Sequence, residues 1–406
     1  MTAPLPPRVP SNPLVATRQP LLPPAGRSRA ALALASMAAV GRFALQRCTA
    51  CATVQYPPRE ACMSCLGADL PWTDVPPDGT LLAETTVRIS ADGYFRSRTP
   101  WRTGLVALDC GPSVVAHLHG DVAVEGRVRL SLRLDKSGQA VMLALPDQDT
   151  PNMNDDPIAR EMHCDPRGRR VLVTDGRNAF GQAMARALLD AGAAQVFTGI
   201  ADGWKPFPGQ VPGDAVDLDL SDAANVHRFA AEFGGRVDIV VHTGLHLRPG
   251  GVLARRDVVT AREEMEAAYF GPLRLAQALG PALRARGADG AHSACAWVMP
   301  VSVDALAPSP GYAAGAAAQA AALSLAHGLR HELLPIRVLT AFLGPLDDDW
   351  HQSVPPPKIS PAAFAAAILR GLRTGLEEVA VGDVAQDMLR RWRDDPSTLA
   401  RERAAN

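Results

Sequence analysis

The fold of the N-terminal part is decided by the stretch Cys48-Thr49-Ala50-Cys51, which Cys62-Met63-Ser64-Cys65 follows after ten residues. Two Cys-x-x-Cys pairs at this separation bring four thiolates to one point, and four soft ligands in a tetrahedron suit Zn²⁺. Four cysteines complete the coordination shell, so the pattern predicts a structural zinc site without an open position for catalysis. Two structural disulfides are the alternative.

The length and charge of the chain limit the classes of function. With 406 residues the chain is too long for one ordinary core, and we expect two or three domains. A formal net charge of -1 gives no electrostatic reason to expect nucleic acid or an anionic membrane as main partner. Outside the two pairs lie Cys110, Cys164 and Cys295, without a pattern. Such a remainder is typical of a reducing compartment, which favours the metal over disulfides.

The N-terminal residues 1–28 are rich in proline and arginine and lack periodicity, which predicts a disordered tail. The prolines argue against an amphipathic targeting helix, and no run reaches the roughly 18 apolar residues that a membrane helix needs. We therefore expect a cytoplasmic protein with no membrane partner. After Ser28, a plausible N-cap, an apolar helix is predicted from Arg29 to Leu45. Such a helix must pack on its own chain or be covered by a partner subunit.

From Gly79 onward the apolar pattern changes to a period of two residues, as in half-buried strands. Five short strands separated by Gly, Pro and Asp turns suit a small closed barrel such as an OB-fold. We expect the zinc ribbon with its helix over residues 29–76 and the barrel over 77–146. The five expected strands are Thr80–Ile89, Thr103–Cys110, Ser113–Gly120, Arg127–Leu134 and Ala140–Leu145.

Residues 43–146 resemble the acyl-CoA-associated family that joins a rubredoxin-like zinc ribbon to an OB-fold. The resemblance implies a small partner subunit of thiolases, thiolase-like aldolases and related acyltransferases. It also implies that ribbon and helix contact the partner and that the barrel lies near the CoA thioester. The matching residues are Arg47, the four cysteines, Gln55-Tyr56-Pro57-Pro58-Arg59, Trp72, Gly79-Thr80 and Gly104-Leu105-Val106-Ala107-Leu108-Asp109.

Residues 147–169 have the composition of a linker, and strand and helix patterns alternate over residues 170–395. This alternation predicts a doubly wound parallel sheet of the Rossmann type, and residues 396–406 are expected to form a tail. The expected strands are Arg170–Thr174, Gln195–Gly199, Ala215–Leu218, Val237–His242, Ala294–Val301 and Ile336–Ala341. The region resembles the short-chain dehydrogenase/reductase family over its whole length.

The glycine turn of that family is altered here. Aligned on Thr174, the first family glycine is Asp175 and the second is Ala179, while the third, Gly181, remains. A carboxylate at this helix N-terminus is expected to satisfy the helix dipole and repel a pyrophosphate, which argues against bound NAD(P).

Other positions of the resemblance are kept only in part. Asp219 matches the residue that touches adenine in the family, and His242-Thr243-Gly244 stands in place of its Asn-Ala-Gly turn. Ile200, with Asp202 nearby, falls where a charged residue selects the cofactor form. The residues of any nucleotide site would be Thr174, Gly181 and Asp219. We interpret His242, His246 and His292 as structural or surface residues, because they lack ligand spacing.

The resemblance also implies a catalytic Ser, Tyr, Lys and Asn. Ser302 matches the serine, but the tyrosine, lysine and asparagine positions are Gly315, Gln319 and Ala268. With Tyr312 as acid in another register, its partner four residues on would be Ala316. No lysine occurs between Lys205 and Lys358, so the motif itself supplies no cation to lower a phenol pKa. We predict a catalytically inactive reductase fold.

The segment Tyr312–Leu333 is rich in Ala and Gly, which allows two backbones to approach closely. In the resembled family this helix and the one near Met265–Leu283 form the dimer interface. We expect a homodimer through this domain; an Ala-rich helix buried within its own domain is the alternative.

Together these features predict an accessory or scaffold subunit of a thiolase-like complex that processes acyl-CoA. An alternative is an NAD(P)-dependent oxidoreductase for a β-hydroxyacyl-CoA, with Tyr312 and Ser302 in an atypical site. A nucleic-acid module of ribbon and barrel is a third reading, but the barrel half offers few aromatic side chains for base stacking.

Overall fold

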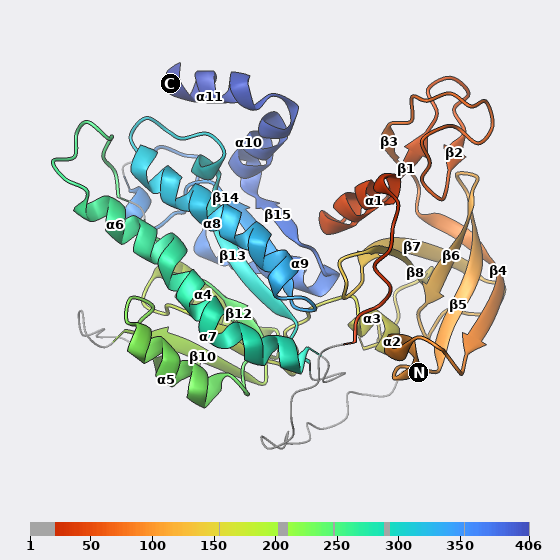
Figure 1. Ribbon diagram of the computed structural model, residues 1–406, viewed down its shortest axis with the longest axis horizontal. Coiled ribbons are helices and arrows are strands. Elements are labelled where there is room, and N and C mark those ends of the chain that lie inside the picture. Colours follow the sequence, from red (N-terminus) through yellow and green to blue (C-terminus); the bar gives the residue numbers. More distant parts are fainter. Residues whose placement is uncertain are drawn as a thin grey trace. The chain divides into compact units, whose positions relative to one another are not determined.

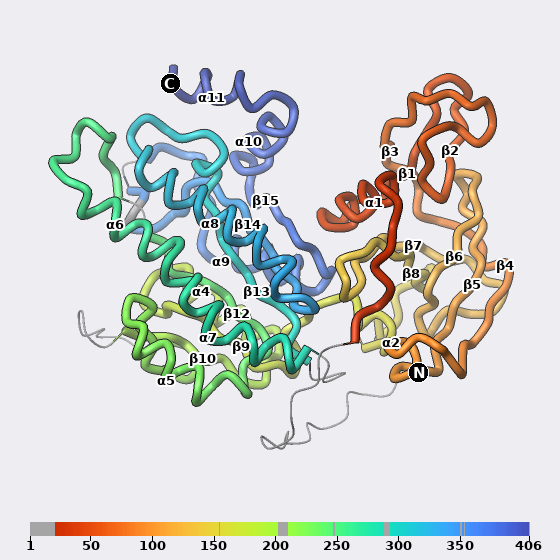
Figure 2. The backbone as a smooth tube through the Cα atoms, viewed as in Figure 1, coloured from red at the N-terminus to blue at the C-terminus, as the bar shows by residue number. Residues whose placement is uncertain are grey.

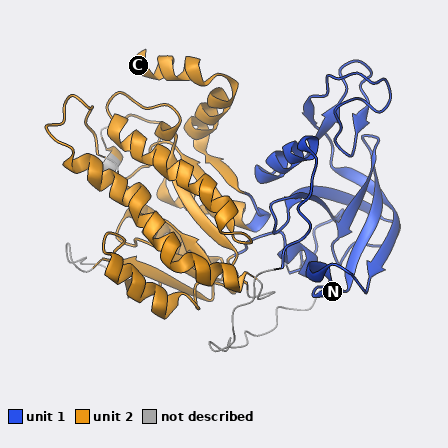
Figure 3. Cartoon of the chain, viewed as in Figure 1, with its two compact units in different colours: residues 1–11, 20–165, 373–376 blue, residues 12–19, 166–372, 377–406 orange. Residues whose placement is uncertain are grey.

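The chain forms two compact units in a computed structural model (Figure 1). The structure describes residues 21–153, 155–201, 210–246, 248–287, 293–352 and 354–405. Within these residues, the first unit contains the segment up to Asp165 and a short piece, Arg373–Leu376. The second contains Pro166–Leu372 and the chain from Glu377 on (Figure 3).

The first unit begins with helix α1, Arg29–Ala39, whose N-cap Ser28 accepts a hydrogen bond from the Ala31 N–H. The expected end at Leu45 is wrong. Gly41, with φ 73°, ends the helical course, and strand β1 follows at Ala44–Arg47. Leu34 and Ala38 are buried against the barrel, so α1 packs on its own chain. A small antiparallel sheet of order β2-β1-β3 then carries the cysteines, with β2 at Val54–Gln55 and β3 at Trp72–Asp74.

The next five strands close into the expected barrel, in the order β4-β5-β6-β8-β7. Strand β7, Arg127–Leu134, alternates buried apolar and less buried polar side chains along its length, so its period of two reflects one face turned to the core. The other strands are β4 (Asp78–Val87), β5 (Trp101–Leu108), β6 (Ser113–Leu118) and β8 (Ala140–Pro146). The short helix α2, Gly93–Arg96, lies between β4 and β5.

The segment after the barrel is not the linker that its composition suggested. Helix α3, Pro157–Arg160, follows the N-cap Asp156, whose carboxylate also accepts the Gly120 N–H at 2.7 Å. Ile158 and Met162 pack into a buried cluster with Trp101 of the barrel. The polar, proline-containing composition hides this apolar spacing, and the boundary between the units falls at Asp165/Pro166 instead.

A buried charge cluster also ties this segment to the barrel. The carboxylate of Glu161 lies 3.0 Å from Arg98 Nε and 3.2 Å from Lys136 Nζ, with all three side chains at most 13% exposed. The Tyr94 hydroxyl donates to the same carboxylate at 3.1 Å. Burial opposes the charge of Glu161, but Lys136 and Arg98 hold its pKa below the usual value.

The second unit is built on a seven-stranded parallel sheet of order β11-β10-β9-β12-β13-β14-β15, as expected for a doubly wound fold. Edge strand β15 was not predicted, because it is short, half-buried and begins with a glutamate. The strands are β9 (Arg170–Val173), β10 (Gln195–Ile200), β11 (Asp214–Asp217), β12 (Ile239–Val241), β13 (Ala296–Ser302), β14 (Arg337–Leu343) and β15 (Glu378–Val381).

Helices connect these strands, and the backbone trace shows the alternation from green to blue (Figure 2). They are α4 (Ala179–Asp190), α5 (Ala223–Phe233), α6 (Val259–Met265), a π-helical turn (Glu266–Phe270), α7 (Gly271–Arg286), α8 (Ala313–Glu332), α9 (Pro361–Thr374), α10 (Gly382–Asp394) and α11 (Pro396–Ala405). The expectation of a tail over 396–406 is therefore wrong for residues 396–405. Helix α11 buries Leu399 against the domain, which a ten-residue window with a single large apolar side chain does not reveal.

In the part of the chain that the structure describes, no helix is long and apolar enough to cross a membrane.

Candidate functional site

The four predicted cysteines converge in the ribbon. Their sulfur atoms all lie within 4.8 Å of one another, with Cys48 and Cys62 buried and Cys51 and Cys65 exposed. The Sγ atoms of Cys48 and Cys65 are 3.5 Å apart and those of Cys51 and Cys62 are 3.6 Å apart. A disulfide bond is about 2.05 Å long, whereas a tetrahedral zinc with Zn–S of about 2.3 Å separates its sulfurs by about 3.8 Å. The geometry fits zinc and rules out the disulfide alternative for these four residues.

Hydrogen bonds adjust the individual thiols. Thr53 lowers the pKa of Cys51 to about 6 through its hydroxyl and its backbone. The Cys65 and Ser64 amides lower the pKa of Cys62. The Gly67 amide lowers the pKa of Cys65, but the neighbouring thiols of Cys51 and Cys48 raise it by more. The net pKa of Cys65 is about 12. Sulfurs this close cannot all be ionised without a cation between them, so a bound Zn²⁺ would be what lets all four act as thiolates.

Two buried glutamines hold the loop between the cysteine pairs. Gln46 accepts the Arg59 N–H at 2.8 Å and donates to the Arg59 carbonyl at 2.9 Å. Gln55 donates to Gln46 at 3.1 Å and accepts the Met63 N–H at 2.9 Å. These bonds fix the peptide beside Cys62 and so orient the second pair toward the first.

Each cysteine pair is followed by a residue with a left-handed backbone conformation, and neither of these residues is glycine. Ala52 follows Cys51 with φ 59°, and Leu66 follows Cys65 with φ 62°. The Leu66 side chain is 78% exposed, and Met63 in the same turn is 57% exposed. A bulky exposed side chain in this conformation is strained, and the fold keeps it.

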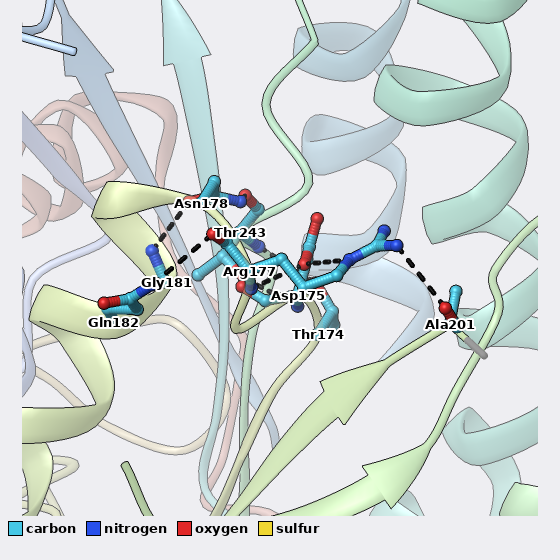
Figure 4. A network of polar contacts seen from close by, with 8 residues as sticks. All are labelled: Thr174, Asp175, Arg177, Asn178, Gly181, Gln182, Ala201 and Thr243. Atoms are coloured by element: carbon cyan, nitrogen blue, oxygen red, sulfur yellow. Dashed lines mark hydrogen bonds and ion pairs between the residues drawn. The ribbon is translucent and has the colours of Figure 1, made fainter. Parts of the chain in front are cut away.

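The candidate nucleotide turn lies at the switch point of the sheet, between the carboxyl ends of β9 and β12 (Figure 4). Asp175 accepts hydrogen bonds from Arg177 N at 2.9 Å and from Arg177 Nε at 3.2 Å. The Arg177 side chain reaches toward the end of β10, where Nη1 lies 3.4 Å from the Ala201 carbonyl oxygen. The charge of Asp175 is thus compensated by its neighbour.

The expectation that Asp175 satisfies the dipole of the following helix is wrong. Asn178 is the N-cap of α4, and its side-chain oxygen accepts the Gly181 N–H at 2.7 Å. Asp175 instead closes the turn before the helix, so it leaves the helix N-terminus to Asn178.

The turn keeps part of the family's close packing. A Cβ on Gly181 would lie 1.8 Å from the Asp175 carbonyl oxygen, so only glycine allows this approach of helix and strand. At the second glycine position the Cβ of Ala179 is exposed at the start of α4, where a phosphate would approach. The turn therefore matches a dinucleotide-binding turn at its third glycine, Gly181. It differs from such a turn at Asp175 and Ala179.

The remaining predicted nucleotide residues have local roles. Thr174 Oγ1 lies 3.2 Å from Nδ1 of the buried His242, and burial lowers the pKa of His242 to about 4. His242 is therefore neutral at physiological pH and joins β9 to β12. Asp219 accepts from Ser221 N at 2.9 Å and from Ser221 Oγ at 2.7 Å.

The other residues that the sequence analysis named make few contacts at this turn or lie outside the described part of the chain. Burial lowers the pKa of His246, whose Nε2 lies 4.0 Å from Glu263. Ile200 ends strand β10. Asp202, Lys205 and His292 lie outside the described residues.

The family's serine and lysine positions, Ser302 and Gln319, meet at the end of β13. Gln319 is 5% exposed, and its side-chain oxygen accepts the Ser302 N–H at 2.9 Å. Gly315, one turn earlier on α8, is also buried. Ala268 is buried in the π-helical turn. Because Gln319 meets Ser302 directly, the register that assigns the tyrosine position to Gly315 agrees with the geometry.

Tyr312 immediately precedes α8 and is half-buried; its N–H donates to the Ser309 carbonyl oxygen at 3.0 Å. Tyr312 lies one residue before the first turn of α8, whereas the family's tyrosine position, Gly315, lies within that turn.

Sequence reasoning missed one part of this site. Asp304 accepts from Ser302 Oγ at 3.2 Å, from Ser309 Oγ at 2.6 Å and from Arg403 Nη2 at 2.6 Å. Arg403 lies on α11, about a hundred residues further along the chain, and no local pattern links it to Asp304.

Family models match both parts of the chain. Residues 35–71 match the model described as the ChsH2 rubredoxin-like zinc ribbon domain, and residues 72–133 match the ChsH2 C-terminal OB-fold domain. Residues 176–382 match the model described as Enoyl-(Acyl carrier protein) reductase.

Two solved structures are similar to this chain. A short-chain dehydrogenase from Burkholderia cenocepacia J2315, solved in complex with NADP, is 30% identical, with a TM-score of 0.52. The match covers 59% of this chain and 98% of that one. A short-chain dehydrogenase from Streptomyces avermitilis is 26% identical over 58% of this chain and 96% of its own, with a TM-score of 0.49.

Among curated proteins, a "Probable oxidoreductase" of Streptomyces lividans is 34% identical over 144 residues, or 31% of this chain. The match spans just under half of that relative, 46% of its length. By the extent of these matches the chain belongs to the short-chain dehydrogenase/reductase family, and it carries a ChsH2-type zinc ribbon and OB-fold in front of the reductase-like domain.

Proposed function

We propose that this protein is an accessory subunit of a complex that processes acyl-CoA with a thiolase-like enzyme. In this role the ribbon and barrel dock onto the partner, which holds the nucleophile. The reductase-like domain dimerises and braces the complex without transferring hydride.

The observation that carries this proposal is the contact of Gln319 with Ser302. An ordinary reductase of this family needs a phenol as acid and a cation that lowers its pKa. Here a neutral amide stands in the place of the cation, buried against the backbone of Ser302. Gly315 offers no side chain at all in the place of the phenol.

Support for docking comes from Met63 and Leu66, which we call the knuckle tip. Both are apolar and exposed, and Leu66 keeps a left-handed backbone that glycine would adopt with less strain. A strained, exposed leucine is explained if a partner surface covers it.

The test is to tag the protein in its native host and identify what co-purifies from wild type and from Leu66→Gly. The substitution removes the side chain and relieves the backbone, so folding improves while docking is lost. We expect a thiolase-like enzyme with the wild type and a strong reduction with the variant. The control is Leu82→Ser, at another exposed leucine of this unit. Serine is used there because glycine would weaken the strand that contains Leu82. Equal recovery with Leu66→Gly would contradict docking through the knuckle tip.

We propose dimerisation through the outer face of α8, where Ala317, Ala320 and Gly328 are exposed and allow close approach of a second backbone. Phe270, which is 45% exposed on the neighbouring π-helical turn, would add apolar contact. Ala320→Arg should convert a dimer into a monomer in light scattering. A wild-type monomer, or a variant that stays dimeric, would refute this interface.

A second candidate function is an NADP-dependent oxidoreductase acting on a β-hydroxyacyl-CoA. The NADP complex of the Burkholderia relative favours it, as does Arg177, which offsets the charge of Asp175 in the turn. This weakens the sequence-based argument against NAD(P). Thr174, Gly181 and Arg177 are the residues that would line such a site, and the nucleotide would supply the hydride.

Titration of the purified protein with NADPH, followed by a turnover assay with a β-oxoacyl-CoA, separates the two candidates. The accessory role predicts no turnover, whether or not NADPH binds. Micromolar binding with turnover that Tyr312→Phe abolishes would establish the oxidoreductase and refute the inactive domain.

A further inference from the structure

The loop that carries Ser302 is held at several points by the C-terminal helix. Residues 303–312 connect β13 to α8 and begin with a 3₁₀ turn, Val303–Ala305, which the Ser302 hydroxyl caps by accepting the Asp304 N–H at 3.2 Å. The same hydroxyl donates to the Asp304 carboxylate. Ser302 is therefore engaged on both sides by Asp304.

Asp304 is in turn fixed from α11. Arg403 donates Nη2 to Asp304 Oδ1 at 2.6 Å and also contacts the Ser309 hydroxyl. Its Nε lies 3.4 Å from the Ala307 carbonyl oxygen. One guanidinium thus contacts the loop at three residues, and the Asp304 side chain is 14% exposed beneath it.

An apolar contact completes the attachment. Leu399, one turn before Arg403 on α11, is 1% exposed. It belongs to a buried cluster with Val301 and Val303, which flank Ser302. Leu399 is the buried residue that α11 contributes, so α11 is attached to the Ser302 loop by one leucine and one arginine. A separate ion pair between Glu402 and Arg391 attaches α11 to α10.

We propose that α11 is a strap that holds the Ser302 loop in place, so that the loop opens only after Arg403 releases Asp304. An attachment to the loop through two residues is released more readily than one with many buried contacts, which suits a segment that opens locally. This role of α11 concerns the order of the loop and is independent of the accessory role.

The test is amide hydrogen exchange of the full chain, comparing Arg403→Gln with wild type. The reporters are the N–H groups of Asp304, Leu306 and Tyr312, which are bonded within the loop. We expect them to exchange roughly ten-fold faster in the variant, with the central strands unchanged. Arg401→Gln, at an exposed residue of the same helix, should behave as wild type.

A double variant checks that Arg403 acts through Asp304. Asp304→Asn alone should also accelerate loop exchange, and adding it to Arg403→Gln should give little further change, because the two residues form one contact. Unchanged loop exchange in Arg403→Gln would overturn the proposal. Equal acceleration throughout the sheet would overturn it too, because Arg403 would then stabilise the whole domain and not the loop.

Discussion

The zinc ribbon and the reductase-like site differ in which functional residues they retain. The ribbon retains all four metal ligands, and its sulfurs lie within 4.8 Å of one another. The carboxyl ends of the parallel strands retain the backbone of a reductase site and Ser302, but present Gly315 and Gln319 at the family's tyrosine and lysine positions. A structural metal site fails when one ligand is lost, because folding depends on it, whereas a parallel sheet folds without its catalytic side chains.

The strongest test of this contrast is removal of the metal. Cys48→Ser with Cys51→Ser should abolish zinc binding and unfold the ribbon, because structural zinc contributes about 10–16 kcal/mol to such small folds. Zinc content by mass spectrometry and exchange of the ribbon amides measure both effects. The sheet of the second unit should keep its exchange rates. Full zinc content in the double variant would mean that the ligands are misassigned.

The next effect concerns the buried charges that stabilise the first unit besides zinc. Glu161→Ala leaves Arg98 and Lys136 without their shared carboxylate, and should lower the free energy of unfolding of the barrel by about 3 kcal/mol. Asp109→Ala is the matched control, because its pair with Arg127 is about half exposed and should contribute under about 1 kcal/mol. Chemical denaturation measures both, and equal losses would show that burial of the Glu161 cluster does not matter.

At the candidate nucleotide turn, the comparison of the two sites predicts that NADPH binding can change without a change in hydride transfer. Asp175→Gly removes a carboxylate from the phosphate turn and frees Arg177, so affinity for NADPH should rise by roughly two- to ten-fold. The proposed inactive domain predicts no hydride transfer in this variant, because Gly315 and Gln319 are unchanged. Fluorescence titration measures the affinity, with Asp190→Asn on the exposed end of α4 as control. Turnover in Asp175→Gly would contradict the proposal that this domain is inactive.

The smallest effect is on the pH dependence of the metal centre. Thr53 lowers the pKa of Cys51 to about 6, so fewer protons have to leave this thiol when zinc binds. In Thr53→Val this pKa rises, and acid-induced zinc release should begin at higher pH. A zinc-sensitive dye follows the release. Thr73→Val on β3 is the control, and identical release curves for Thr53→Val and wild type would exclude a role of the hydroxyl.

Much of the fold followed from local patterns. The barrel strands, the parallel sheet and the zinc ligands were predicted within a few residues, because side-chain period and cysteine spacing are properties of neighbouring residues. Errors arose where context overrides composition. Residues 147–169 have the composition of a linker, yet Ile158 and Met162 dock on the barrel. Strand β15 is too short to be recognised before its partner is known, and helix α11 is short and has a single large apolar side chain.

The candidate sites divide in the same way. The zinc ligands could be predicted from the sequence alone, and so could the proposed replacement of the catalytic tyrosine and lysine, since both depend on which residue types are present. That Arg177 compensates Asp175, that Asn178 caps α4 and that Arg403 holds Asp304 became evident only in three dimensions. A charge is neutralised by whatever lies next to it in space, and for Arg403 that neighbour is about a hundred residues away in the chain. The cysteine pairs needed no such information, because each pair forms its half of the metal site within four residues.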